Sequence, residues 1–213
     1  MWNILKYLDV IAPFFALILF LLNKELLKEK AIRYMYLFLI VQIVFNGISI
    51  GIGLFRNGNT HIYFHLNCLF SFYLILSYFE EIKILSKKLL LSILFITIYI
   101  GYLIMEDGFF RFNSMGFSLA SLIIVILCFK YYYFLLKNPQ LDSFFNSNVF
   151  WITTGLFTYY VCNFIIFSTF GYMTKIAPHA GYLWRFHNVV LFILCIYLIK
   201  GISCKKKELI SFL

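Results

Sequence analysis

The sequence predicts an all-α fold: a polytopic integral membrane protein whose residues 1–213 form a single bundle of seven transmembrane helices. Hydrophobic residues make up 63% of the chain and charged residues only 13%, whereas soluble proteins have about 45–50% and about 25%. Several apolar runs approach the roughly 20 residues that a helix needs to cross a bilayer. The charged residues are concentrated between these runs. Together these observations exclude an ordinary soluble protein.

The apolar runs place the seven helices one after another along the chain. We expect spans at about residues 3–22, 34–55, 61–79, 89–105, 112–134, 149–170 and 183–202. In the first, the apolar run Val10–Leu22 has 13 residues and would reach only about 20 Å, short of the roughly 30 Å hydrocarbon layer. This helix must therefore extend back toward Trp2, which draws Asp9 below the membrane surface, and Pro13 is expected to kink it.

Polar residues in spans two and three follow a helical spacing. Gln42, Asn46, Ser49 and Gly53 share one face of span two, and His61, His65, Cys68 and Phe72 share one face of span three. Residues separated by three or four positions lie on the same side of a helix. A polar stripe in lipid is expected to face the interior of the bundle.

The four remaining spans differ in polar content. Span four is almost featureless, so we expect much of it to face lipid, and Glu106 and Asp107 end it. Span five carries Ser114, Ser118 and Ser121 on one face, and small residues at this spacing favour close helix packing. Span six includes Asn163, and span seven opens with Trp184, Arg185, His187 and Asn188 before an apolar run.

The distribution of basic residues predicts the orientation. With seven spans, 13 of the 18 lysines and arginines fall on one side: Lys24, Lys28, Lys30, Arg33, Lys83, Lys87, Lys88, Lys130, Lys137, Lys200, Lys205, Lys206 and Lys207. The other side has Lys6, Arg56, Arg111, Lys175 and Arg185. Basic residues collect in the cytoplasm. We therefore expect a multi-pass protein of the inner (plasma) membrane, with the N-terminus outside and the C-terminus cytoplasmic.

This orientation places most polar intramembrane residues in the outer half of the bilayer. By helix rise, Asp9, His65 and His187 lie within about 10 Å of the outer surface, and Asn46 and Asn163 about two turns below it. Such groups usually face a bundle interior or a wet cavity. The sequence predicts a ligand pocket open to the extracytoplasmic side, in which Asp9 pairs with His65 or His187. The predicted pocket residues are Asp9, Asn46, His65, Asn163, Trp184, His187 and Asn188.

This pocket predicts a receptor-like, sensory or accessory bundle, and several alternatives stay open. The same polar residues could serve only as interhelical glue. The chain could be a transporter or channel subunit, although the inner half of its spans has few polar residues that could form a path across the membrane. It could be a membrane-embedded enzyme that uses Asp9 with a histidine. A metal or haem site could involve His61, His65 or His187. The sequence does not determine which cofactor, if any, is bound.

The predicted partners follow from the charge pattern. The formal net charge is +9, but the basic residues lie beside apolar runs, where they act as topology signals and contact lipid headgroups. The expected partner is therefore the lipid bilayer and not nucleic acid. Because the sequence shows no soluble output domain, a sensory role would need a membrane or cytoplasmic signalling partner, reached through the basic inner loops.

The chain resembles a group of small, largely uncharacterised seven-span membrane proteins of Bacteroidota. The residues that carry this resemblance are His65, Phe150, Trp151, Ile152, Gly155, Tyr159, Asn163, Phe164, Trp184, His187 and Asn188. Spans six and seven match best. In that group span three often has an acid where this chain has Ser71, so no charge pair is implied there. The resemblance implies a seven-helix fold and a sensory or accessory role.

Overall fold

The computed structural model describes residues 4–23, 25–55, 58–105, 108–138, 144–176 and 181–204. They form seven α-helices: α1 Leu8–Leu22, α2 Lys30–Phe55, α3 His61–Glu81, α4 Lys88–Met105, α5 Ser114–Lys137, α6 Asn148–Ile176 and α7 Gly181–Ser203. Short 3₁₀ turns are η1 Ile4–Tyr7, η2 Leu26–Lys28, η3 Gly108–Phe110 and η4 Phe144–Asn146. The described residues contain no strand. All seven helices are long and apolar enough to cross a membrane, the first together with part of η1. The all-α class and the seven apolar helices are thus confirmed.

Most helix ends lie within three residues of the predicted spans, but α1 begins only at Leu8, after η1, and some helices continue beyond their apolar part. α2 begins at Lys30, inside the charged stretch, and α6 continues to Ile176. Apolar composition indicates where the bilayer ends, but a helix stops only where its backbone bonding stops, so these two run further. Some residues used in the predictions lie outside the described part of the chain: Trp2, Lys24, Arg56, Glu106, Asp107, Lys205, Lys206 and Lys207.

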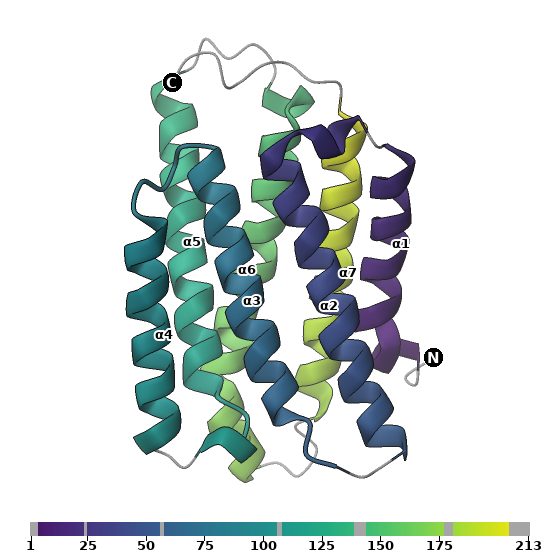
Figure 1. The fold of residues 1–213 in the computed structure, drawn as a ribbon, viewed down its shortest axis with the longest axis vertical. Coiled ribbons are helices and arrows are strands. Elements are labelled where there is room, and N and C mark those ends of the chain that lie inside the picture. Colours follow the sequence, from purple (N-terminus) through teal and green to yellow (C-terminus); the bar gives the residue numbers. More distant parts are fainter. Residues whose placement is uncertain are drawn as a thin grey trace.

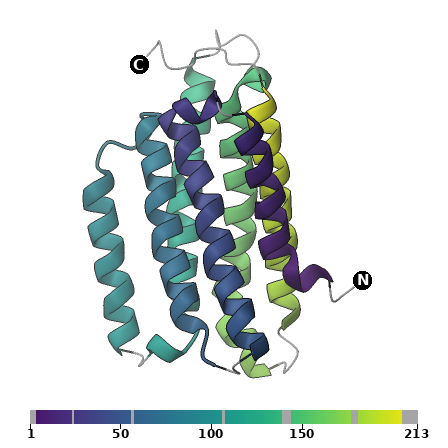
Figure 2. The ribbon, with the colours of Figure 1, turned by 45° about the vertical axis from the view of Figure 1, so that its right-hand side comes forward.

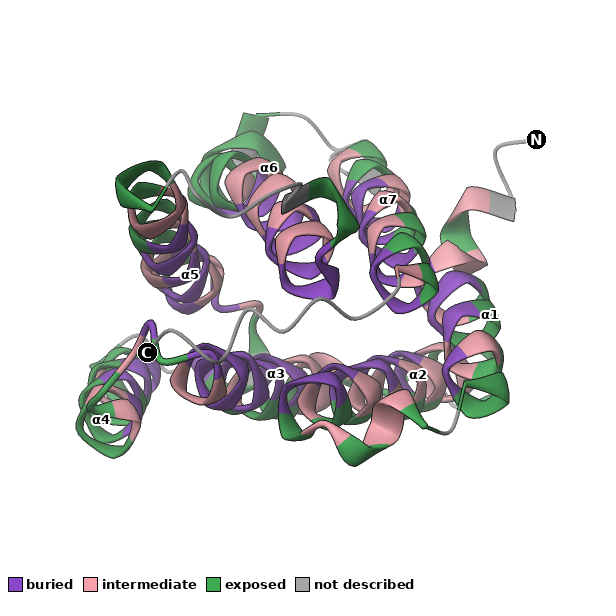
Figure 3. Cartoon of the chain, turned by 90° about the horizontal axis from the view of Figure 1, so that it is seen from above, coloured by how far each residue is buried: buried purple, intermediate pink, exposed green. Residues whose placement is uncertain are grey.

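The helices stand side by side in two rows (Figures 1 and 3). α4, α3 and α2 form one row, α5, α6 and α7 form the other, and α1 closes one end by packing against α2 and α7. Successive helices alternate in direction, so α1, α3, α5 and α7 all end on the side where the C-terminal end lies. We call this the inner end of the bundle and the opposite side the outer end, after the orientation that the sequence predicts.

α3 and α4 show the two extremes of burial. α3 has the largest buried share of the seven helices and α4 the smallest, and α4 stands at the edge of the bundle (Figure 2). Its buried residues Ser92, Phe95, Tyr99 and Leu103 form one stripe at helical spacing. The rest of α4 is apolar and exposed, which agrees with the expectation that much of it faces lipid.

The two rows are joined at the inner end of the bundle. The Tyr78 hydroxyl on α3 donates to the Val149 carbonyl at 3.3 Å and lies 3.0 Å from Thr153 Oγ1, both on α6. Lys130 on α5 donates to the Ile84 carbonyl, just after α3, at 2.6 Å. These bonds close the inner half around a packed core.

α6 and α7 approach each other closely because of a glycine. A Cβ at Gly155 would lie 2.6 Å from Tyr197 Cβ and 3.0 Å from Leu194 Cδ1, which is closer than real side chains pack. Only glycine therefore allows this approach, and small residues serve the same purpose in many membrane bundles. Two turns toward the outer end, the same approach brings Asn163 and His187 into contact.

Candidate functional site

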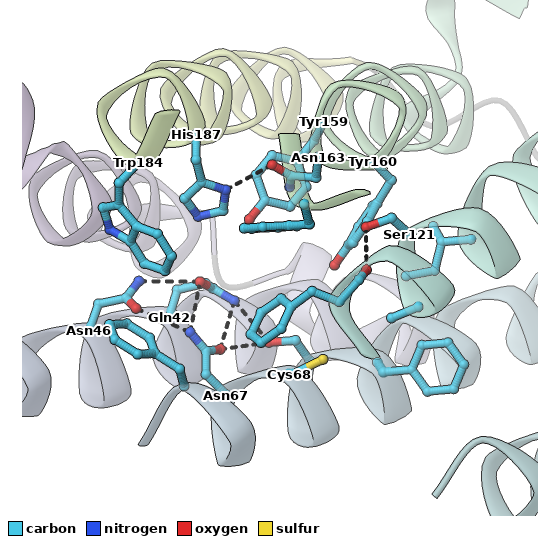
Figure 4. Close-up of a pocket in the computed structure, with 17 residues that line it drawn as sticks. Gln42, Asn46, Asn67, Cys68, Ser121, Tyr159, Tyr160, Asn163, Trp184 and His187 are labelled. Carbon is cyan, nitrogen blue, oxygen red and sulfur yellow. Dashed lines mark hydrogen bonds between the residues drawn. The ribbon is translucent and has the colours of Figure 1, made fainter. Parts of the chain in front are cut away.

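A cavity lies between the two rows in the outer half of the bundle (Figure 4). Its volume is about 40 Å³, whereas one water needs about 10–15 Å³. Five helices supply its walls, and its polar side chains lie on α2, α3, α5, α6 and α7. The lining residues are Gln42, Asn46, Phe64, Asn67, Cys68, Ser71, Phe72, Phe117, Ala120, Ser121, Ile124, Tyr159, Tyr160, Asn163, Phe167, Trp184 and His187.

One wall of the cavity is a hydrogen-bonded network between α2 and α3, formed by Gln42, Asn46, Asn67 and Ser71. Gln42 Nε2 donates to Asn67 Oδ1 at 3.0 Å and to Ser71 Oγ at 2.8 Å. Gln42 Oε1 accepts from Asn46 Nδ2 and from Asn67 Nδ2, both at 3.3 Å. Asn67 also donates to Asn46 Oδ1 at 3.2 Å and accepts from Ser71 Oγ at 2.9 Å. We call this network the amide wall.

The spacing of these residues explains why the amide wall forms. Gln42 and Asn46 are one turn apart on α2, and Asn67 and Ser71 are one turn apart on α3. The short connection between the two helices makes them antiparallel neighbours, so the two pairs meet at the same depth. In an apolar environment an unpaired amide is costly, and the four side chains satisfy one another.

α1 contributes to the amide wall through its backbone. Pro13 has no N–H, so the carbonyl of Asp9, four residues earlier, lacks its usual partner in the helix. Asn46 Nδ2 donates to this carbonyl at 3.4 Å. The proline of the first span thus ties α1 to α2 at the level of the cavity.

The opposite wall is centred on His187 of α7 and Asn163 of α6. Their Nδ1 and Oδ1 atoms lie 2.8 Å apart, and both side chains are buried. The His187 ring lies against Trp184, Phe167 and Tyr159, with ring centroids 5.3, 5.3 and 5.6 Å away. Figure 4 shows the ring pointing from α7 toward the amide wall. We call this side the histidine wall.

The two walls are not joined to each other at the level of the cavity. Among the hydrogen bonds between described residues, none connects a cavity-lining side chain of α2 or α3 with one of α5, α6 or α7. Each wall is therefore fixed internally, and the cavity separates them.

Aromatic side chains separate the cavity from the outer end of the bundle. Trp184 lies at ring distances of 4.9 Å from Phe64, 5.5 Å from Phe112 and 6.5 Å from Phe170. Phe112 also contacts Phe167 at 5.4 Å and Phe170 at 5.0 Å. We call these five residues the aromatic cap. A molecule that enters from the outer end passes these residues.

The structure brings together four of the residues predicted for the pocket. Asn46, Asn163, Trp184 and His187 all line the cavity. They come from α2 and from the consecutive helices α6 and α7, which are far from α2 in the sequence. Their predicted position in the outer half of the bilayer is the signal that identifies them in the sequence.

Asp9, His65 and Asn188 do not line the cavity. α1 stands at the end of the rows, and the buried Asp9 side chain forms no ion pair with a histidine among the described residues. The expected Asp9–histidine pair is therefore not formed. Asn188 points to the start of the chain, where Nδ2 donates to the carbonyls of Leu5 and Lys6 at 3.0 and 3.3 Å.

His65 points to the other side of α3. Its Nδ1 lies 2.9 Å from the hydroxyl of Tyr99 on α4. Because two residues turn a helix by about 200°, His65 and Asn67 face opposite sides, and Asn67 takes the side toward α2. His65 therefore attaches the peripheral helix α4 to the bundle.

Of the histidines named as metal or haem candidates, His61 and His65 lie one turn apart on α3, whereas His187 lies on α7. His65 contacts α4, whereas His187 contacts α6 on the opposite side of the cavity. Within the described part of the chain, no group of three or more His, Cys, Asp and Glu side chains is placed to hold a metal ion. The geometry therefore gives no support to a metal site built from these histidines.

The amide wall was only partly predicted. Gln42 and Asn46 were recognised as a polar face of α2, but Asn67, Ser71 and Tyr160 were not assigned to the site. One signal was available: Asn67 and Ser71 have the same four-residue spacing as Gln42 and Asn46. The spacing of His65 and Cys68 indicates a different face of α3, so Asn67 and Ser71 are not identified from the sequence.

Comparisons with protein-family models, with curated proteins and with solved structures found no match. The resemblance to seven-span proteins of Bacteroidota therefore stays a prediction.

Proposed function

We propose that this chain is an integral protein of the inner (plasma) membrane, with its outer end extracytoplasmic and its inner end in the cytoplasm. The outward-facing surface is apolar: Phe15, Ile126 and Ile165 are 61%, 57% and 59% exposed, and a soluble protein rarely presents such a continuous apolar surface. Lys30 and Lys200 lie at the inner end, where α2 begins and α7 ends. This distribution matches the excess of basic residues in cytoplasmic loops.

Within the membrane, the chain acts as a receptor-like sensory bundle with its pocket between the amide wall and the histidine wall. The observation that carries this proposal is that each wall is hydrogen-bonded internally while no described bond crosses the cavity. The bonds within each wall join neighbouring helices, as polar side chains do in many membrane bundles, but they leave the two rows unconnected at the level of the cavity. A ligand that bonds to both walls would favour one separation of the rows over another, which is how a ligand shifts a conformational equilibrium.

The inner half of the bundle favours a receptor over a transporter or channel. Tyr78 bridges the rows by bonds to Val149 and Thr153, so the cavity ends at a packed layer. The signal therefore has to leave through a change in helix positions. A membrane or cytoplasmic partner that contacts the basic inner end would read this change.

A native cysteine offers a direct test of the pocket. Cys68 lines the cavity, and a thiol reacts only as the thiolate, which needs water. In a variant that retains Cys68 alone, methyl methanethiosulfonate (a small neutral reagent) is expected to modify the thiol of the folded protein in nanodiscs. Mass spectrometry measures the rate of modification.

Cys195 is the matched control, because it is also buried, on α7, but does not line the cavity. A Cys195-only variant is expected to stay unmodified, and equal rates for the two cysteines would contradict the pocket. A Cys204-only variant tests the orientation, since Cys204 follows the inner end of α7. An impermeant maleimide should label Cys204 only after cells are opened, and labelling of intact cells would reverse the orientation.

A further inference from the structure

We propose that the cavity binds a small uncharged molecule that carries at least two hydrogen-bond donors, as carboxamides and short polyols do. This inference rests on the proposed receptor function and specifies its ligand. Three properties of the cavity carry it: the hydrogen-bonding capacity left on the amide wall, the free nitrogen of His187, and the charge and size of the lining.

The amide wall has used all of its donor hydrogens. Each side-chain amide nitrogen of Gln42, Asn46 and Asn67 donates two bonds, and an amide NH₂ has two hydrogens. The hydroxyl hydrogen of Ser71 is donated to Asn67 Oδ1. Acceptor capacity remains, because Asn46 Oδ1 and Ser71 Oγ each accept one bond and have a second lone pair. A guest can therefore meet this wall only with donors.

His187 presents an acceptor from the opposite side. Its Nδ1 bonds to Asn163 Oδ1, and because a carbonyl oxygen only accepts, Nδ1 carries the proton. In a neutral imidazole the other nitrogen is then an acceptor. No described residue bonds to Nε2, and Figure 4 shows the ring extending into the space between the walls. A guest that spans the cavity thus needs two donor hydrogens, one directed at each wall.

The histidine wall also carries a hydroxyl group that can bond to an oxygen atom of such a guest. Tyr160 lines the cavity, and in Figure 4 its hydroxyl points toward the space between the walls. A hydroxyl donates as well as accepts, so the Tyr160 hydroxyl can donate to a carbonyl or hydroxyl oxygen of the guest.

The lining sets the charge and the size of the guest. No Asp, Glu, Lys or Arg is among the described residues that line the cavity, so an ion would lose its hydration without a counter-charge, which is costly in an apolar environment. The volume of about 40 Å³ is far below the roughly 300–1,000 Å³ of pockets for drug-sized ligands. Only a molecule of a few non-hydrogen atoms fits.

Three planar probes of similar size separate these properties. Acetamide is neutral and has two donor hydrogens, acetone is neutral and only accepts, and guanidinium has donors but is charged. The full-length protein, labelled with ¹⁵N-histidine in nanodiscs, reports binding through the Nε2 resonance of His187. The resonance is identified as the one lost in His187→Gln.

We expect Nε2 to be the unprotonated nitrogen, and its resonance to shift saturably with millimolar acetamide. Acetone and guanidinium should bind on the order of tenfold more weakly or not at all, because each leaves a buried acceptor or a buried charge uncompensated. An equal response to acetone or guanidinium would overturn the ligand class, as would a protonated Nε2. If no probe binds although Cys68 reacts with methyl methanethiosulfonate, the pocket stands and the ligand class is wrong. If Cys68 does not react either, the proposed function itself fails.

Discussion

Replacing Gln42 with leucine is expected to destabilise the bundle by about 2–3 kcal/mol. Gln42 makes four hydrogen bonds to Asn46, Asn67 and Ser71, and interhelical hydrogen bonds in membrane bundles average about 0.6 kcal/mol each. Leucine has a similar volume, so packing changes little, while the remaining polar groups of the amide wall lose their partners. Equilibrium unfolding in mixed micelles measures the change.

Ser49 supplies the matched control for this substitution. It is buried on the same polar face of α2, but its hydroxyl has no hydrogen-bond partner among the described residues. Ser49→Ala therefore removes a polar group without breaking a bond, and its effect should be small. If Gln42→Leu costs no more than Ser49→Ala, the amide wall is not a stabilising network.

Replacing Trp184 with alanine is expected to accelerate modification of Cys68 by methyl methanethiosulfonate about tenfold or more. Trp184 contacts Phe64, Phe112 and Phe170 in the aromatic cap. An aromatic pair contributes about 0.5–1.5 kcal/mol, and 1.4 kcal/mol is a factor of ten in a population or a rate. Loss of these contacts should increase the fraction of protein molecules in which the aromatic cap is open.

The Trp151→Ala variant distinguishes opening of the aromatic cap from general destabilisation of the bundle. Trp151 lies at the inner end, where its indole donates to the Phe145 carbonyl at 2.7 Å and its ring stacks on Tyr197. This variant should also lose stability, but Cys68 should react at the wild-type rate. Equal acceleration in both variants would show that access does not pass through the aromatic cap.

The sequence was sufficient to predict the number of helices and the half of the bundle that holds their polar residues, but not the rotation of each helix. Length and polarity set the spans, and helix rise placed Asn46, Asn163 and His187 in the outer half of the bundle. Rotation is hard to read in membrane helices, because lipid and the bundle core are both apolar and the usual polar–apolar periodicity is weak. α3 is the clearest case, since polar residues lie on two of its sides and both sides are buried.

Asp9 and His65 show the same limit for the candidate site. Their depths match that of His187, and depth was the basis of the predicted pairing. The structure separates them because α1 stands at the end of the rows and because His65 faces α4. Two residues at one level of a seven-helix bundle can lie on opposite sides of it, and only the order of the helices around the bundle distinguishes these cases.

The central claim is that the two walls are fixed internally and are not bonded to each other, and a set of double-mutant cycles tests it most directly. The cycles use alanine substitutions in the pairs Gln42–Asn67, Asn163–His187 and Asn46–His187, with unfolding free energy measured in mixed micelles. The first two pairs lie within a wall and should show coupling of about 0.6–1.7 kcal/mol. The third pair spans the cavity and should be additive within about 0.3–0.5 kcal/mol. Coupling between Asn46 and His187 as large as that within a wall would contradict the claim and identify the polar residues as glue across the bundle.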